Sequence, residues 1–144
     1  MKKKIAILGS TGSIGVNTLN ILKRDKKSFE VNLLTTNKNI NKIFKQAKEF
    51  KVRSIIISDI SSYKKAKIRF KKSRINIYNN FDHLNKIFRV KNDIIMSSIT
   101  GLNGLSPTLK SIKYTKKILI ANKESIICGW NLINKELKKY KTSF

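Results

Sequence analysis

The sequence predicts an α/β protein in which helices cover both faces of a doubly wound, mostly parallel sheet. Two observations lead to this fold class. Short apolar runs alternate with amphipathic segments from one end of the 144 residues to the other. The first apolar run leads into three closely spaced glycines (Gly9, Gly12 and Gly15), and an amphipathic segment follows directly. We find no internal repeat and no low-complexity linker, so residues 1–144 are expected to form one domain.

The segment IAILGSTGSIG, residues 5–15, has the composition of a strand, a tight phosphate-binding turn and the start of a helix. Gly9 would let the chain leave the strand in a tight turn. Gly12 would let the backbone approach a pyrophosphate, and Gly15 would let the helix pack closely on the strand. The glycine spacing is GxxGxxG rather than the more usual GxGxxG, and the alternative interpretation is an ordinary glycine-rich turn.

Hydroxyl groups accompany these glycines. Ser10, Thr11 and Ser13 are interpreted as additional donors toward a phosphate. The free N–H groups and the positive dipole end of the following helix would face the same phosphate. Because the turn follows a strand and precedes a helix, we expect dinucleotide binding and a Rossmann-like topology.

The other elements follow from hydrophobic periodicity and from helix-start signals. Strands are expected at residues 3–8, 31–36, 54–58, 75–78, 93–99 and 117–121, with the strand at 75–78 near an edge of the sheet. Helices are expected at residues 14–24, 40–50, 61–72, 82–88 and 131–140, and one more begins at Ser106 as N-cap and Pro107 as first helical residue. Residues 142–144 follow a helix in this alternating order, so they are expected to lead into a further strand.

The composition is that of a globular protein, with 40% hydrophobic residues and no apolar run long enough to span a bilayer. The basic residues at the N-terminus lead directly into a strand, which is unlike a signal peptide. We therefore expect a cytoplasmic protein without a membrane partner. The single cysteine, Cys128, excludes an internal disulfide and is expected to be a small packing residue.

The chain is strongly basic, with 32 Lys and Arg residues against 8 Asp and Glu and a formal net charge of +24. One interpretation is a nucleic-acid-binding module without enzymatic activity. Lysine pairs are spread over the whole chain, however, and no aromatic-rich RNA-binding signature is present. These features favour a general residue bias, and we expect no specific nucleic-acid partner. A basic surface still attracts anionic, phosphorylated ligands.

The residues after the second expected strand bear on the choice of cofactor. In nicotinamide-binding folds, a carboxylate there often binds the ribose 2′-hydroxyl of NAD. Residues 34–39, LTTNKN, contain no carboxylate. Lys38 would attract a 2′-phosphate, while Thr36, Asn37 and Asn39 could supply uncharged hydrogen bonds. We therefore expect NADPH to be preferred over NADH; the alternative is that Lys38 is one more solvated lysine.

Polar residues also follow two later strands, where ligands of such sheets bind. Residues 97–104, SSITGLNG, form a small polar loop whose two glycines would let a flat ring lie close to the backbone. Residues 121–125, ANKES, bring an amide, a cation, a carboxylate and a hydroxyl to a strand end. Helix capping alone accounts for Asn122 and Glu124. It does not account for Lys123, which is disfavoured beside a positive helix end unless an anion is near.

Metal-ligating and catalytic patterns are not evident. The eight acidic residues are scattered without the spacing of a metal site, and the single histidine, His83, has no evident partner. The residue pattern therefore assigns no catalytic residue and no metal ligand.

Four stretches read together closely resemble the 1-deoxy-D-xylulose 5-phosphate reductoisomerase family of the non-mevalonate isoprenoid pathway. They are GSTGSIG at residues 9–15, NKN at 37–39, TGLNGLSPTL at 100–109 and LIANKES at 119–125. Their order and spacing resemble the family over essentially the whole chain. The resemblance implies an oxidoreductase that uses NADPH and Mg²⁺ or Mn²⁺. Such an enzyme isomerises a sugar phosphate, 1-deoxy-D-xylulose 5-phosphate, and reduces it to 2-C-methyl-D-erythritol 4-phosphate, usually as a homodimer.

The resemblance also implies site residues by position. The NADPH pyrophosphate would be held by Thr11, Gly12, Ser13 and Ile14, and the adenosine end with its phosphate by Asn37, Lys38 and Asn39. Asn122 and Glu124 would contact NADPH, and Lys123 would contact the substrate.

Two departures from the family pattern accompany the resemblance. Asn37 stands where the family often has glycine, and asparagine tolerates a positive φ better than most residues. The family's metal-binding motif, similar to VDSEH, and its catalytic and C-terminal domains are not in these 144 residues. We therefore expect residues 1–144 to be the N-terminal NADPH-binding domain, which binds NADPH without turning over alone. A different NADP-dependent oxidoreductase that uses the same first turn is the second hypothesis.

Overall fold

Six strands and six α-helices alternate along the chain, and the computed structural model describes all of residues 1–144. The strands are β1 (Lys3–Leu8), β2 (Phe29–Thr36), β3 (Ser54–Ile57), β4 (Asn76–Tyr78), β5 (Asn92–Ser97) and β6 (Thr115–Ile120). The helices are α1 (Ser13–Arg24), α2 (Ile40–Glu49), α3 (Ile60–Arg69), α4 (Leu84–Ile87), α5 (Leu105–Ile112) and α6 (Lys123–Tyr140). Two short 3₁₀ turns, η1 (Phe81–His83) and η2 (Leu102–Gly104), precede α4 and α5.

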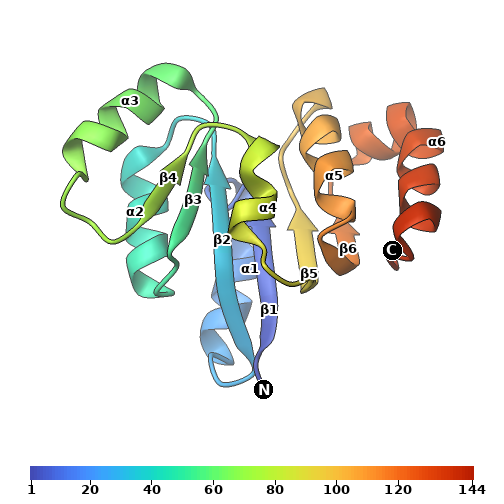
Figure 1. Cartoon of the computed structure of the whole chain (residues 1–144), viewed down its shortest axis with the longest axis horizontal. Coiled ribbons are helices and arrows are strands. Elements are labelled where there is room, and N and C mark those ends of the chain that lie inside the picture. The colour runs from blue at the N-terminus through green and yellow to red at the C-terminus, as the bar shows by residue number, and fades with distance from the viewer.

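The strands form one parallel sheet in the order β4-β3-β2-β1-β5-β6. The chain winds outward from β1 to one side through β2, β3 and β4, and then returns to add β5 and β6 on the other side (Figure 1). The direction of winding therefore reverses between β1 and β5. Ligands of open α/β sheets bind at the carboxyl ends of the strands beside such a reversal. The predicted doubly wound parallel fold is confirmed, and β4 lies at an edge as expected.

Alternate side chains of each strand enter two separate cores. Ile5 and Ile7 of β1 pack with residues of α1, α2 and α3 on one face. Ala6 and Leu8 pack with residues of α4, α5 and α6 on the other face. Figure 1 shows α1 behind the sheet and α4 in front of it. Because both faces are covered, the strands read as nearly continuous apolar runs, as in the III of β3.

Two helix starts differ from the sequence prediction. Helix α6 begins at Lys123 rather than at residue 131, because Asn122 caps it. Helix α5 begins at Leu105 after Gly104, so Ser106 is not its N-cap. Pro107 is then the third helical residue, a position where the missing N–H costs nothing because first-turn N–H groups have no partner within the helix.

Two further expectations concern single positions. Cys128 is exposed on α6, so its assignment as a packing residue was wrong. Residues 142–144, which are expected to lead into another strand, make one parallel bridge beside β6, between Ser143 and Lys117. The bridge consists of Ser143 N donating to Lys116 O at 2.8 Å and Ile118 N donating to Ser143 O at 2.9 Å.

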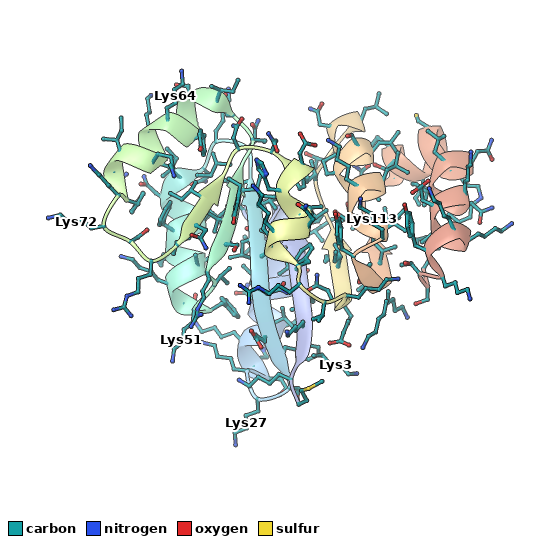
Figure 2. All side chains as sticks on the ribbon, in the orientation of Figure 1. Lys3, Lys27, Lys51, Lys64, Lys72 and Lys113 are labelled. Carbon is teal, nitrogen blue, oxygen red and sulfur yellow. The ribbon has the colours of Figure 1, made fainter.

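Lysine side chains project outward around the whole molecule, as the six labelled lysines in Figure 2 illustrate. Ion pairs neutralise few of them: the structure has only Lys23–Glu49, Lys110–Asp82 and Lys116–Asp93. None of the helices is long and apolar enough to cross a bilayer.

Because the cores are closely packed, truncation of a buried isoleucine should lower the free energy of unfolding far more than truncation of an exposed one. Ile7 has no exposed surface, whereas Ile21 on α1 is 68% exposed. We expect Ile7→Ala to lower the free energy of unfolding by about 2–5 kcal/mol, because it opens a cavity in a packed core. Ile21→Ala should change it by less than about 0.5 kcal/mol. Urea unfolding followed by circular dichroism measures both, and equal losses would contradict the described packing.

Candidate functional site

The turn after β1 lies against the end of β5. Gly9 has φ +83°, and a Cβ added there would lie 2.9 Å from the backbone carbonyl carbon of Ser98. Only glycine accommodates both the left-handed backbone and this close approach. Gly15, in the first turn of α1, is equally constrained, because an added Cβ would lie 2.5 Å from the Cα of Ser10. The roles predicted for Gly9 and Gly15 are confirmed.

A small pocket of about 190 Å³ opens at this place, at the carboxyl ends of β1, β2, β3 and β5. Its lining is made mainly by small and polar residues, together with one aromatic and one aliphatic side chain. The residues are Gly9, Thr11, Gly12, Thr35, Thr36, Asn37, Ser58, Phe81, Ser98, Ile99 and Thr100. The pocket therefore joins the glycine-rich turn, the start of the NKN segment and the SSITGLNG loop, three stretches that the sequence singled out separately.

Helix α1 presents an uncapped N-terminus beside this pocket. Its N-cap residue is Gly12, which has no side chain to accept a hydrogen bond. No hydrogen bond joins the N–H groups of Ser13, Ile14 or Gly15 to the preceding turn. By contrast, α2, α3 and α6 are each capped by an Asn or Asp side chain. Free N–H groups with a positive dipole end form a ready anion site.

The three hydroxyls near the turn have different environments. Ser10 is fully buried and bonds to Gln46 Oε1 at 2.9 Å and to Thr35 O at 3.2 Å, so the expectation that it serves as a phosphate donor was wrong. Thr11 shares a 2.7 Å hydrogen bond with Thr36 and thereby ties the turn to the end of β2. Ser13 is exposed and free.

The NKN segment, residues 37–39, is exposed to solvent at the end of β2. Asn37 accepts a hydrogen bond from Ser58 Oγ at 3.2 Å, and its φ is not positive, so the predicted need for tolerance of a positive φ does not arise. Asn39 caps α2 by accepting from Lys42 N at 3.1 Å. Lys38 is exposed and has no ion pair.

Asp59, the N-cap of α3, adjoins this segment, since its backbone N–H donates to Asn37 O at 3.2 Å. Hydrogen bonds from Ser62 hold the pKa of Asp59 below its usual value, and Lys38 adds a smaller Coulombic attraction. Asp59 is therefore ionised near neutral pH and offsets part of the Lys38 charge without pairing to it.

Asn122 links the ANKES segment to the SSITGLNG loop. It is 4% exposed, and its amide nitrogen donates to Gly101 O at 2.7 Å and to Ile99 O. Its oxygen accepts from Ser125 N at 3.0 Å and so caps α6. The capping role considered for Asn122 is confirmed, and the amide also anchors the SSITGLNG loop.

Lys123 and Glu124 occupy the first turn of α6. Lys123 is exposed, Glu124 is half-buried, and neither makes an ion pair. They do not line the 190 Å³ pocket, but the contacts of Asn122 hold the start of their helix against the loop that does.

Two pocket residues, Ser58 and Phe81, are not among the site residues predicted from the sequence. Ser58 directly follows the buried strand β3, so its place at a strand end was a usable signal. Phe81 belongs to a short 3₁₀ turn after β4, and no pattern in the sequence indicates that this turn folds over the pocket.

Metal-ligating groups do not gather anywhere in the molecule. No group of three or more His, Cys, Asp or Glu side chains could hold a metal ion. His83 lies against Tyr78, with ring centroids 5.7 Å apart.

Comparison with known proteins identifies relatives of this arrangement. A family model described as 1-deoxy-D-xylulose 5-phosphate reductoisomerase matches residues 5–129. The reductoisomerase of Pelagibacter ubique is 56% identical over 144 residues, covering 99% of this chain and 37% of the relative. That of Phocaeicola vulgatus is 36% identical over 143 residues, with the same coverage of 99% and 37%. The chain thus spans little more than a third of these relatives' length.

Solved structures agree with this result. The reductoisomerase of Zymomonas mobilis in complex with NADPH superposes with a TM-score of 0.88 at 29% identity, over 99% of this chain and 38% of that one. A reductoisomerase in complex with NADPH, fosmidomycin and magnesium gives 0.87 at 31% identity, over 97% and 35%. A homoserine dehydrogenase of Staphylococcus aureus, at 15% identity and a TM-score of 0.57, shares the fold alone.

The geometry predicts that Asn122 stabilises more than an ordinary helix cap. Asn122→Ala removes a cap and leaves two loop carbonyls without their donor, whereas Asn39→Ala removes only a cap. We expect Asn39→Ala to cost about 1 kcal/mol and Asn122→Ala about 2–3 kcal/mol in unfolding free energy. Urea titrations of the two variants make the comparison, and a smaller or equal loss for Asn122→Ala would rule out the anchoring role.

Proposed function

Since the chain belongs to the 1-deoxy-D-xylulose 5-phosphate reductoisomerase family, we propose that it forms the NADPH-binding part of such an enzyme. The enzyme's reaction would be the isomerisation and reduction of 1-deoxy-D-xylulose 5-phosphate to 2-C-methyl-D-erythritol 4-phosphate. One observation carries this proposal more than any other: the uncapped N-terminus of α1 opens beside a pocket at the point where the winding of the sheet reverses.

The residues at the turn fit a pyrophosphate. Gly12 is exposed, and even an added Cβ would make only ordinary contact with Gly9 O at 3.5 Å, so the space above it is open. The N–H groups of Ser13 and Ile14 are free to donate to an anion. In the proposed complex Thr11, Gly12, Ser13 and Ile14 hold the pyrophosphate, with the Ser13 hydroxyl as a further donor.

The NKN segment is proposed to bind the adenosine end. Lys38 is exposed at the end of β2, where a ribose 2′-substituent lies in folds of this kind. Its ammonium group attracts a 2′-phosphate, and Asn37 and Asn39 supply uncharged hydrogen bonds beside it. The amide nitrogens of both asparagines remain available, because only their oxygens are engaged within the chain.

The start of α6 is proposed to border the reactive end of the cofactor. Asn122 and Glu124 contact NADPH, and Lys123 reaches the phosphorylated substrate. Support comes from the charge: Lys123 is an unpaired cation in the first turn of a helix, a place that becomes favourable only beside an anion. Asn122 contributes by holding the loop at Ile99 and Gly101, which keeps a flat surface for a ring.

The reduction itself requires groups that residues 1–144 do not provide. NADPH, when bound, supplies the hydride. The family's Mg²⁺ or Mn²⁺ has no fitting ligand set here, because no acidic or histidine cluster exists in this chain. We therefore place the metal ligands and the rest of the catalytic machinery outside residues 1–144, in an enzyme that we expect to act as a homodimer.

Cofactor selectivity provides the first test of this proposal. Calorimetric titration of the folded chain should show saturable NADPH binding that is about tenfold or more tighter than NADH binding. Lys38→Ala should weaken NADPH binding about five- to tenfold and leave NADH unchanged, because only NADPH has the 2′-phosphate. Lys113→Ala removes an equal charge just before β6, at the opposite edge of the sheet, and serves as the control. Equal effects of the two variants would reduce Lys38 to one of many solvated lysines.

Activity provides the second test. With 1-deoxy-D-xylulose 5-phosphate, NADPH and Mg²⁺, the 144-residue chain should oxidise NADPH no faster than a sample without protein, because it contributes no metal ligands. The decrease in absorbance of NADPH measures the rate. Turnover that depends on the chain and on Mg²⁺ would contradict the placement of the metal site outside these residues.

A further inference from the structure

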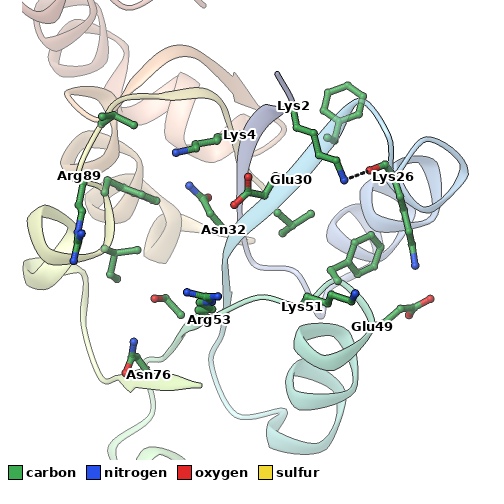
Figure 3. A pocket seen from close by; sticks show the side chains of 17 residues that line it. Lys2, Lys4, Lys26, Glu30, Asn32, Glu49, Lys51, Arg53, Asn76 and Arg89 are labelled. Atoms are coloured by element: carbon green, nitrogen blue, oxygen red, sulfur yellow. Dashed lines mark hydrogen bonds between the residues drawn. The ribbon is translucent and has the colours of Figure 1, made fainter. Parts of the chain in front are cut away.

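A second and larger hollow lies at the opposite edge of the sheet, where the strands begin. Its volume is about 1170 Å³, and it is bordered by the starts of β1, β2, β3 and β4 and by the segment between α4 and β5. Six basic side chains line it, and we call this hollow the basic basin: Lys2, Lys4, Lys26, Lys51, Arg53 and Arg89 (Figure 3).

The positive charge of the basic basin is hardly neutralised. Only two carboxylates line it, Glu30 and Glu49. Glu49 is already paired with Lys23 at 2.5 Å, and the hydrogen bond from Lys23 lowers its pKa. None of the six basic side chains takes part in an ion pair. One unpaired carboxylate therefore stands among six cations.

This clustering differs from the rest of the surface. Lysines such as Lys64 and Lys72 extend from convex surface into solvent, where they can move apart (Figure 2). The cations of the basic basin instead come from separate elements and line one concave surface, which concentrates the positive potential.

Helix dipoles account for only part of this charge. Lys26 and Lys51 follow the C-terminal ends of α1 and α2, where a cation is favoured. The same explanation does not apply to the other three cations. Lys4 lies within β1, Arg53 directly precedes β3, and Arg89 lies in the loop between α4 and β5. These three side chains border the same half of the hollow in Figure 3.

The side chains suit phosphate rather than a single carboxylate. Arg53 and Arg89 each offer a planar fork of N–H groups that matches phosphate oxygens, and lysines add mobile point charges. Apolar rings, among them Phe29 and Phe50, form part of the wall. Lys26 lies 5.2 Å from the centre of the Phe50 ring. At about 1170 Å³, slightly more than the roughly 300–1,000 Å³ of small-molecule pockets, the hollow is large enough for several phosphate groups.

We propose that the basic basin binds a small oligophosphate anion, at a site separate from the glycine-rich turn. The two sites lie at opposite edges of the sheet, so occupation of one leaves the other open. This inference does not depend on the reductoisomerase assignment, since none of its residues belongs to the proposed NADPH site.

The test is a calorimetric titration of the 144-residue chain with inorganic tripolyphosphate, first alone and then with saturating NADPH. We expect saturable binding near one per chain, unchanged by NADPH. The double variant Arg53→Gln/Arg89→Gln should weaken it about tenfold. The control Lys64→Gln/Lys72→Gln removes the same net charge and should weaken it less than about twofold. All four side chains are exposed, and circular dichroism checks that both variants remain folded.

Three outcomes would overturn the proposal. Equal losses in the two double variants would show attraction by overall charge. Competition between NADPH and tripolyphosphate would place the anion at the glycine-rich turn. Absence of saturable tripolyphosphate binding, together with binding of a single-stranded RNA that both variants weaken equally, would show a general polyanion surface. Failure of NADPH to bind would contradict the proposed function and leave the titration with tripolyphosphate alone fully interpretable.

Discussion

The close packing of Gly15 on the turn after β1 is the contact on which this structure depends. Helix α1 begins so near the backbone of Ser10 that no side chain fits between them. On the other side of the turn, Gly9 is in contact with the end of β5 at Ser98. The turn is thus held between its own helix and a neighbouring strand. These contacts fix the position of the free N–H groups at the start of α1, beside the pocket. N–H groups held in this way can bind an anion.

Polar side chains stabilise this edge of the sheet and also determine which groups stay available to a ligand. Ser10 and Gln46 satisfy one another through two hydrogen bonds in the interior, and Thr11 is joined to Thr36. Asn122 holds the loop after β5 and caps α6 at the same time. The groups that remain without an internal partner include the N–H groups at the start of α1 and the side chains of Lys38, Lys123 and Glu124. The proposed cofactor site is the part of this edge that the fold itself leaves unsatisfied.

The two proposed sites, at opposite edges of the sheet, differ in the groups that they offer to an anion. At the carboxyl edge, the proposed anion site consists mainly of backbone N–H groups, and no charged side chain lines the pocket beside it. At the amino edge, the basic basin consists of side-chain cations over a wall with aromatic rings. A backbone site demands one geometry and accepts few ligands, whereas flexible side chains adapt to anions of different shape. A strongly basic chain can therefore have one selective phosphate site and one broader one.

The amino-acid sequence by itself determined the alternation of strands and helices, the position of the glycine-rich turn and the family. These features depend on local periodicity, on residues without a Cβ and on short motifs, all of which can be read along the chain. It did not determine where α6 begins, because the polar ANKES residues describe a strand end equally well until Asn122 is seen to cap the helix. Nor did it show that Ser10 is buried, that Cys128 is exposed or that Phe81 reaches the pocket. Only the tertiary structure decided these points and brought six cations to the lining of the basic basin. Each of these features depends on contacts between segments that are distant in the sequence, whereas sequence periodicity reports only which residues share a face of one helix or strand.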